Sequence, residues 1–196
     1  MNRLTSAVTA LALLAVPELA SASTWEIDGG HSAAQFSVRH LMVSNVRGEF
    51  GKVTGTVNLD DKDVTKSTVE ATIDASTINT REEKRDQHLK SADFFDVAKF
   101  PSITFKSKKV AKAGGDNLKV TGDLTIHGVT KEIVLNVEGL AKPTKDPWGN
   151  TKSGATATTK INRKDFGLTW NKALETGGVV VGEDVNITID IELLKK

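Results

Sequence analysis

The sequence predicts an all-β fold, an antiparallel barrel of eight strands with one short helix and an apolar central cavity. Three observations carry this prediction: eight runs of alternating apolar and polar residues, turn residues between them at hairpin spacing, and small residues at many inward positions. Short antiparallel strands at this spacing suit either a sandwich or a closed barrel. Small inward side chains favour the barrel, because eight strands can enclose one small ligand.

The alternating runs follow one another along the chain after residue 33. The first four cover residues 34–40, 53–59, 69–75 and 103–105, and the last four cover 118–126, 133–137, 155–161 and 185–193. Each run predicts a strand with one buried face. Turn residues separate the runs, as in Gly114-Gly115-Asp116-Asn117 and Pro147-Trp148-Gly149-Asn150. The small inward residues are Ala34, Gly55, Ala71, Ala75, Gly122, Ala155 and Ala157.

One segment, about residues 80–91, breaks the alternation and predicts a helix. It has no period of two and is rich in helix-forming residues. Thr80 is followed three residues later by Glu83, which fits a capping box and places the helix start there. We expect this helix over one end or side of the barrel, followed by the adjacent aromatic residues Phe94 and Phe95 in a connection.

The first 22 residues are typical of a secretory signal peptide. Arg3 gives a basic start, residues 4–16 are uncharged and mostly apolar, and Ala20-Ser21-Ala22 offers the small residues that a signal peptidase recognises. The apolar run is too short to span a bilayer, which takes ~20 residues. We therefore expect cleavage after Ala22, one domain over residues 23–196, and a soluble, periplasmic or secreted protein that is not integral to a membrane.

The composition excludes several classes of protein. The chain has 196 residues, 26 basic and 25 acidic, and no cysteine. Removing residues 1–22 removes one arginine and one glutamate, so the net charge stays +1 and no basic excess indicates nucleic-acid binding. The lack of cysteine excludes disulfides, a thiolate zinc site and a lipoprotein anchor. The hydrophobic core must therefore stabilise the fold without disulfides or a thiolate zinc site.

No residue pattern demands catalysis, and we expect neither a catalytic set nor a bound metal. Gly30-His31-Ser32-Ala33-Ala34 approaches the hydrolase pattern G-x-S-x-G, but it ends in alanine and leads into a strand. His40 shares a face with the apolar residues of the first run, so we expect it inside the barrel or at its mouth. No two of the four histidines have the i, i+4 spacing of a helical zinc site: His31, His40, His88 and His127.

Several stretches of the chain resemble the YceI-like family of exported lipid-binding proteins, and they occur in family order over about residues 24–193. They are His31-Ser32 with residues 36–40, residues 85–90 with 93–97 and Phe100-Pro101, residues 122–131, and residues 162–168. Phe100 stands where members often carry tyrosine, in a chain without tyrosine. The resemblance implies an extended, lipocalin-like barrel of eight antiparallel strands with a helix, holding a long lipid in its cavity.

The resemblance also implies the class of ligand. Family ligands are polyisoprenoids, including isoprenoid quinones and polyprenyl phosphates, and in some members fatty acids or their amides. Many members are periplasmic, and homodimers occur in the family. No cofactor is expected beyond such a bound lipid.

The alternation laid onto that barrel gives the candidate site. The ligand-binding candidates are Phe36, Val38, His40, Phe94, Phe95, Phe105, Trp148 and Trp170, and the headgroup candidates are Arg39 and His40. About ten enclosed carbons gain ~8 kcal/mol gross, and ordering the ligand offsets a large part of it, so a long tail and a deep cavity are required. If Phe36, Phe105 and Trp170 are packed core, alanine in their place should chiefly unfold the protein. If they line a pocket, the loss should fall on lipid binding.

Carriage, storage or sequestration of such a lipid is the expected function, and two other classes stay open. One is a filled barrel that serves as an interaction or stress-related module without a ligand. The other is an enzyme acting on an isoprenoid lipid, for which His31 with His40 is the available acid/base candidate.

Overall fold

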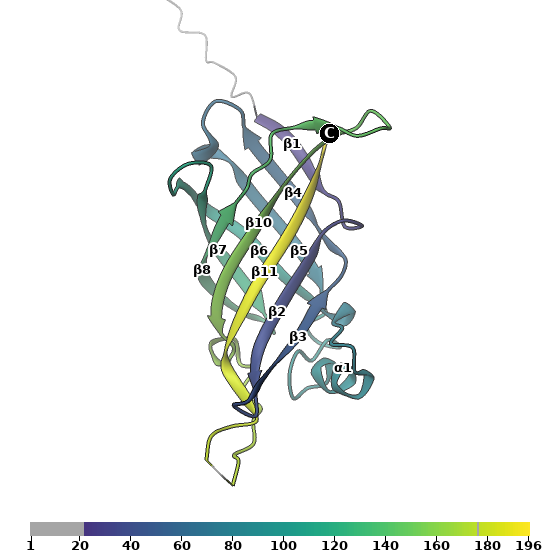
Figure 1. Ribbon diagram of the computed structural model, residues 1–196, viewed down its shortest axis with the longest axis vertical. Helices are drawn as coiled ribbons and strands as arrows, with labels where there is room; N and C mark the ends of the chain where they lie inside the picture. Colours follow the sequence, from purple (N-terminus) through teal and green to yellow (C-terminus); the bar gives the residue numbers. More distant parts are fainter. Residues whose placement is uncertain (1–21, 176) are drawn as a thin grey trace, which may run out of the picture.

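The computed structural model describes residues 22–175 and 177–196, and this part of the chain is mostly β-structure (Figure 1). The expected signal segment lies outside the described residues apart from Ala22, so its cleavage stays a prediction. Within the described part, no helix combines the length and the apolar character needed to cross a bilayer.

The strands form a closed antiparallel barrel with eight wall positions, which confirms the expected fold (Figure 1). The ring closes where β10 pairs with β11 along almost its whole length, from Lys152 opposite Leu194 to Asn162 opposite Asp184. The eleven strands of the described residues are β1 (Ala22–Ile27), β2 (Ala33–His40), β3 (Ser44–Phe50), β4 (Val53–Asp60), β5 (Thr68–Asp74), β6 (Ser102–Lys112), β7 (Leu118–Ile126), β8 (Val129–Glu138), β9 (Thr144–Lys145), β10 (Thr151–Asn162) and β11 (Val181–Lys195).

Eleven strands fit eight wall positions because three positions are each built from two strands: β1 with β2, β3 with β4, and β8 with β9, which both pair with β10. One edge of β11 pairs first with β2 and then, nearer its end, with β1. Likewise β3 flanks β2, and β4 flanks β1. At the break between β1 and β2, the Ser32 hydroxyl accepts a hydrogen bond from the Glu192 backbone N–H at 3.0 Å. The Ser32 side chain thus supplies the hydrogen bond that a paired strand would otherwise make to β11.

One α-helix and three short 3-10 helices complete the described structure. The helix α1 (Glu83–Lys90) lies beside the lower end of the barrel in Figure 1. The 3-10 helices are η1 (Val64–Lys66), η2 (Ala75–Thr77) and η3 (Arg163–Phe166). The expected capping box is wrong in its residues, because Glu82 is the N-cap and its carboxylate accepts from the N–H groups of Lys84 and Arg85. Thr80 instead donates its hydroxyl to Asp86.

Two of the small inward residues do not leave open space, contrary to the expectation from the sequence. Gly55 has φ +149°, and a Cβ built on it would lie 2.1 Å from the backbone oxygen of Glu70 on β5. A Cβ on Gly122 would lie 2.5 Å from the Phe105 ring. These glycines therefore allow β5 and the Phe105 ring to approach closely, and the cavity is made by other residues.

Large buried side chains strengthen the barrel near both ends. Trp25 on β1 is 1% exposed, and its indole N–H donates to the Ser23 hydroxyl at 2.8 Å. Phe166 in η3 is also 1% exposed. Both belong to the contiguous apolar core, and neither lines the cavity described next.

Candidate functional site

An apolar cavity of about 270 Å³ lies inside the barrel. Its lining reaches from Leu193 to Val181 on β11, and the twelve steps between these residues span roughly 40 Å at ~3.3 Å per residue. A cavity of this length with so small a volume is narrow. All of its lining residues are apolar except five, which are Gln35, Ser67, Thr104, Thr159 and Arg163.

Alanines opposite isoleucines create the open space in the wall formed by β10 and β11. Ala155 pairs with Ile191, and Ala157 pairs with Ile189. All four residues line the cavity, because their inward positions repeat with the period of two expected for strands. A methyl group opposite a larger aliphatic chain leaves room that two large side chains would fill.

Five of the predicted ligand-binding residues line the cavity: Phe36, Val38, Phe94, Phe95 and Phe105. Three aromatic rings form a connected group at the α1 end. The Phe36 and Phe50 ring centroids lie 5.7 Å apart, and Phe50 meets Phe95 edge-on at 5.4 Å. The segment after α1 thus completes the cavity wall that β2 and β3 begin.

Trp170 lies near the cavity but does not line it, so it differs from the predicted placement. Its ring centroid lies 5.3 Å from that of Phe94 and 4.9 Å from that of His88. The His88 ring is in turn held by Asp93, with Nε2 and the carboxylate 2.8 Å apart. Phe94 lines the cavity and Trp170 does not, so Trp170 supports a lining residue through this ring contact.

The structure places Trp148, Arg39 and His40 outside the cavity lining. For Trp148 this differs from the predicted pocket position, whereas the role of Arg39 and His40 as headgroup candidates at the mouth stays a prediction. Trp148 is 84% exposed, because Asp146 accepts from the backbone N–H of Trp148 and fixes a turn that points away from the barrel. Arg39 is exposed and donates to the Met42 carbonyl at 2.8 Å. His40 is half-buried at the last position of β2, where the strand turns away.

The histidine pair considered for catalysis is not brought together. His31 precedes β2 and His40 ends it, so nine residues of extended chain place them roughly 30 Å apart. His31 instead contacts Asp28, with Nδ1 and the carboxylate 3.1 Å apart. The near match to the hydrolase pattern is a strand break, where Ser32 bonds the backbone of Glu192.

Arg163 is the one charged side chain in the described lining of the cavity, and sequence reasoning missed it. It is 3% exposed and donates to the backbone carbonyls of Leu168, Val181 at 3.2 Å and Gly182 at 2.8 Å. Burial lowers the pKa of its guanidinium, and the charge of Glu183 opposes that shift. These three bonds use three of its five N–H donors, so two N–H donors remain.

A signal for Arg163 exists in the sequence. The inward positions of β10 are 155, 157, 159 and 161, and the same period of two continues to position 163. A charged residue at the inward position where a strand ends is a candidate for contact with a polar ligand group. The resemblance had also singled out residues 162–168, without assigning them a role.

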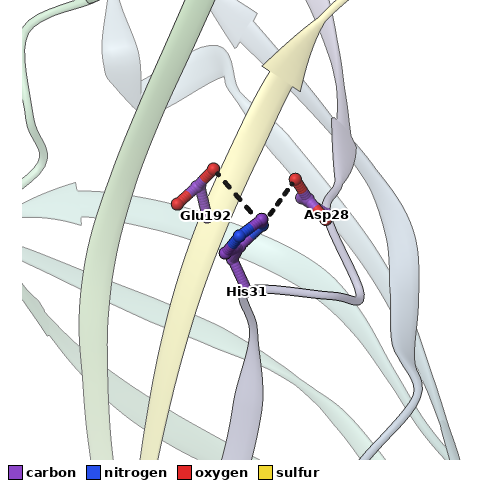
Figure 2. Close-up of side chains that lie close together, drawn as sticks. All are labelled: Asp28, His31 and Glu192. Carbon is purple, nitrogen blue, oxygen red and sulfur yellow. Dashed lines mark hydrogen bonds and ion pairs between the residues drawn. The ribbon is translucent and has the colours of Figure 1, made fainter. Parts of the chain in front are cut away.

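A polar cluster lies on the outside of the barrel, where β1 breaks (Figure 2). Asp28, His31 and Glu192 bring their ligand atoms within 4.8 Å of one another, as a metal site would. The Lys152 ammonium, however, lies 2.6 Å from the Asp28 carboxylate and 2.9 Å from that of Glu192. Lys152 therefore supplies the cation that balances these carboxylates and ties β10 to β11 and to the end of β1.

The ion pairs of Lys152 predict a pH-dependent contribution to stability. The hydrogen bond from Lys152 holds the pKa of Asp28 at about 2, and the two carboxylates raise that of Lys152. A depressed carboxyl pKa stabilises the fold above the unfolded value of 3.8, and this stabilisation is lost as the pH falls towards 2. We expect Lys152→Met to lower the urea midpoint at pH 7, and the difference from wild type to shrink between pH 4 and pH 2. An equal difference at all pH values would contradict this.

Comparisons with known proteins agree with this architecture. A model of the YceI-like domain family matches residues 25–193. A UPF0312 protein of Staphylococcus aureus is 42% identical over 172 residues, which cover 87% of this chain and 96% of that protein. The crystal structure of the Campylobacter jejuni YceI protein superposes with a TM-score of 0.68 at 34% identity, covering 81% of this chain and 90% of that one.

Two more distant solved structures share the fold. Burkholderia cenocepacia BcnA superposes with a TM-score of 0.74 at 22% identity, covering 85% of this chain and 98% of that one. A polyisoprenoid binding domain from Saccharophagus degradans, implicated in plant cell wall breakdown, superposes with a TM-score of 0.64 at 16% identity, covering 88% of this chain and 98% of that one. At these identities the likeness concerns the fold alone.

Proposed function

This chain belongs to the YceI-like family, and we propose that it binds one long isoprenoid chain in the barrel cavity and carries, stores or sequesters it. The proposed ligand class is an amphiphilic polyisoprenoid, such as an isoprenoid quinone or a polyprenyl phosphate. A fatty-acid derivative is the alternative lipid of similar shape. The polyisoprenoid binding domain of Saccharophagus degradans, which has this fold, supports the choice.

The shape and lining of the cavity carry the proposal. The cavity holds about 270 Å³, slightly below the ~300–1,000 Å³ typical of ligand pockets, but its lining extends over most of β11. A single unbranched or methyl-branched chain suits such a space better than a fused-ring ligand. Each enclosed methylene gains ~0.8 kcal/mol, so affinity rises with chain length until the cavity is filled.

The polar end of the ligand is assigned to the α1 end of the cavity, next to Arg163. The guanidinium has two N–H donors left after its backbone bonds. Charge-assisted hydrogen bonds to phosphate or carboxylate are stronger than those between neutral groups. An anionic headgroup such as phosphate would therefore be preferred over a neutral alcohol of the same chain length.

Export is part of the proposal. Residues 1–22 read as a signal peptide, which would place the barrel in a periplasm or outside the cell, where a carrier meets envelope lipids. N-terminal sequencing of the protein recovered from a periplasmic extract checks this. A mature N-terminus at Ser23 supports export, and an intact Met1 in that compartment contradicts cleavage after Ala22.

Mass spectrometry of the protein purified without detergent tests the ligand. Native spectra should show one bound lipid per chain, and organic extracts of the same sample should yield a polyprenyl or quinone species. A fatty-chain species in the extract would shift the ligand class while keeping the binding function. A folded, monodisperse protein that carries no lipid and takes none up from added polyprenols would overturn the proposal in favour of a filled barrel.

Replacing Arg163 separates headgroup recognition from structural support. We expect Arg163→Gln to lower the affinity for a polyprenyl phosphate by about tenfold or more, the value of one charge-assisted hydrogen bond. The affinity for the polyprenol of equal length should change much less. Fluorescence competition against one labelled probe measures both. An equal loss for the two lipids would mean that Arg163 only holds η3 against β11.

A further inference from the structure

The turn between β2 and β3 exposes three consecutive apolar side chains, Leu41, Met42 and Val43, here called the hairpin tip. Their exposed fractions are 39%, 52% and 75%. They are three of the five large exposed hydrophobic residues in the described part of the chain. Exposed apolar residues are ordinary when scattered singly, whereas a contiguous group marks a contact surface.

The backbone of the hairpin tip is also costly for these residues. Leu41 and Met42 have φ values of +50° and +63°, and the Val43 N–H donates to the His40 carbonyl across them at 3.1 Å. A hairpin turn with two positive φ values strongly prefers Asn-Gly. Leucine and methionine therefore cost backbone free energy and also expose apolar surface. Nothing within the part of the folded chain that the structure describes offsets these two costs, which indicates that the hairpin tip contacts a partner outside the chain.

The hairpin tip continues the wall of the cavity at its α1 end. The Leu41 N–H donates to the Val180 carbonyl at 2.8 Å, and His40 pairs with Val181. Val181 and Val38 both line the cavity. In Figure 1 this hairpin and the loop that precedes β11 together form the lower end of the molecule, on the same side as α1.

The hairpin itself carries positive charges beside its tip, and the acidic side chains at the start of β11, Glu183 and Asp184, are paired with Lys164 and Lys160. Residues 38–48 contain Arg39 and Arg47 and no acidic residue. Both arginines are exposed and occupy outward positions of the hairpin. In the facing loop, Lys172 and Glu175 balance each other in charge. An apolar tip flanked by arginines fits a surface that is apolar inside and anionic outside, which describes an anionic lipid bilayer.

We propose that the hairpin tip docks the protein on an anionic phospholipid bilayer. The apolar side chains of the tip enter the boundary between headgroups and acyl chains, and Arg39 and Arg47 contact lipid phosphates. The α1 end of the cavity, with Arg163, then faces the membrane from which an isoprenoid lipid would come. The biological role of docking rests on the proposed lipid-carrier function, but binding of the protein to a bilayer can be measured separately from lipid carriage.

The double variant Leu41→Asn with Met42→Gly tests docking without threatening the fold. It installs the pair that the turn prefers, so the melting temperature should stay equal or rise. Binding to vesicles of phosphatidylglycerol and phosphatidylcholine, measured by flotation, should fall by about tenfold or more because the tip loses its apolar surface. The protein is used as purified, with its N-terminus determined by mass spectrometry. Unchanged flotation of this variant would overturn the proposal.

Trp148→Ala is the matched control, because it removes an exposed aromatic side chain from the opposite end of the barrel. The turn containing Trp148 precedes Lys152, which pairs with Leu194, whereas the hairpin tip adjoins Val181 at the other end of β11. Flotation of Trp148→Ala should equal that of wild type. A loss with this variant, and none with the tip variant, would assign docking to the other end and contradict the proposal.

Two further measurements define what a failure means. Arg39→Gln with Arg47→Gln should remove the dependence of vesicle binding on phosphatidylglycerol and on salt. If the wild type bound purely zwitterionic vesicles equally well at all salt concentrations, the anionic assignment would be overturned.

Native mass spectrometry reports lipid in the cavity independently. A loaded protein that does not float overturns docking alone, whereas a protein that floats but never takes up lipid overturns the carrier function. A tip that instead mediates self-association would appear as a dimer lost in the tip variant, and would overturn membrane docking.

Discussion

Replacement of Ala157 by phenylalanine is expected to abolish lipid binding in a protein that remains folded. Ala157 lies in the middle of β10, is 8% exposed, and lines the cavity opposite Ile189. A benzyl group at this position projects into a narrow space that has no side room for both the ring and a ligand chain. Native mass spectrometry should show the wild type loaded and Ala157→Phe empty.

Thr158→Phe is the control for this variant. Thr158 is the next residue on the same strand, and its side chain points to the outside of the barrel. The same aromatic side chain there should leave lipid binding unchanged. Overpacking a wall costs ~1–3 kcal/mol, so Ala157→Phe should unfold cooperatively at a somewhat lower midpoint, whereas the outward Thr158→Phe should stay close to the wild-type midpoint. Retained lipid in Ala157→Phe would place the ligand outside the barrel.

The number of barrel positions could be predicted from the sequence because the eight alternating runs each carry apolar side chains on one face. Strands β1 and β3 and the two-residue strand β9 were missed, the first two for a physical reason. In β3, Val46 and Phe50 are the only large apolar residues among seven, because the strand pairs along its length with β2 alone and most of its side chains are exposed. In β1, the buried face includes Ser23, whose hydroxyl is paired with the Trp25 indole. Alternation detects burial of apolar surface, and polar residues can occupy such positions once they are hydrogen-bonded.

The lining of the cavity was predicted in part, and the differences between the predicted and the observed lining have a common origin. Phe36, Val38 and Phe105 lie on regular strands, so their inward orientation follows from the period of two. Trp148 lies in the turn between β9 and β10 and His40 at the last position of β2, and there the turn decides the orientation. The same holds for glycine, since Gly122 was expected to open space and instead admits the Phe105 ring. The pairing register of the strands decides which neighbouring side chain fills the gap beside a small residue. Alternation of apolar and polar residues alone does not specify that register.

Replacement of Trp25 by alanine is expected to reduce the free energy of unfolding by about 3–5 kcal/mol, as for other large-to-small changes at buried aromatic residues. Trp25 is 1% exposed and packs in the core, and the Lys195 ammonium lies 5.6 Å from its ring centroid. Typical domains are stable by only ~5–15 kcal/mol, so this one change removes a large share. Urea unfolding followed by far-ultraviolet circular dichroism measures it.

Trp25→Phe separates packing from hydrogen bonding at the same position. Phenylalanine keeps most of the buried aromatic surface but cannot donate to the Ser23 hydroxyl, so a loss of about 1 kcal/mol is expected. Because Trp25 does not line the cavity, both variants should bind lipid under conditions in which they are folded. This is the reverse of Ala157→Phe, which should lose its ligand and keep most of its stability. Suppose instead that fully folded Trp25→Ala lost as much bound lipid as Ala157→Phe. The cavity would then have to extend past the core that Trp25 forms, and the separation between the barrel end and the binding site would be wrong.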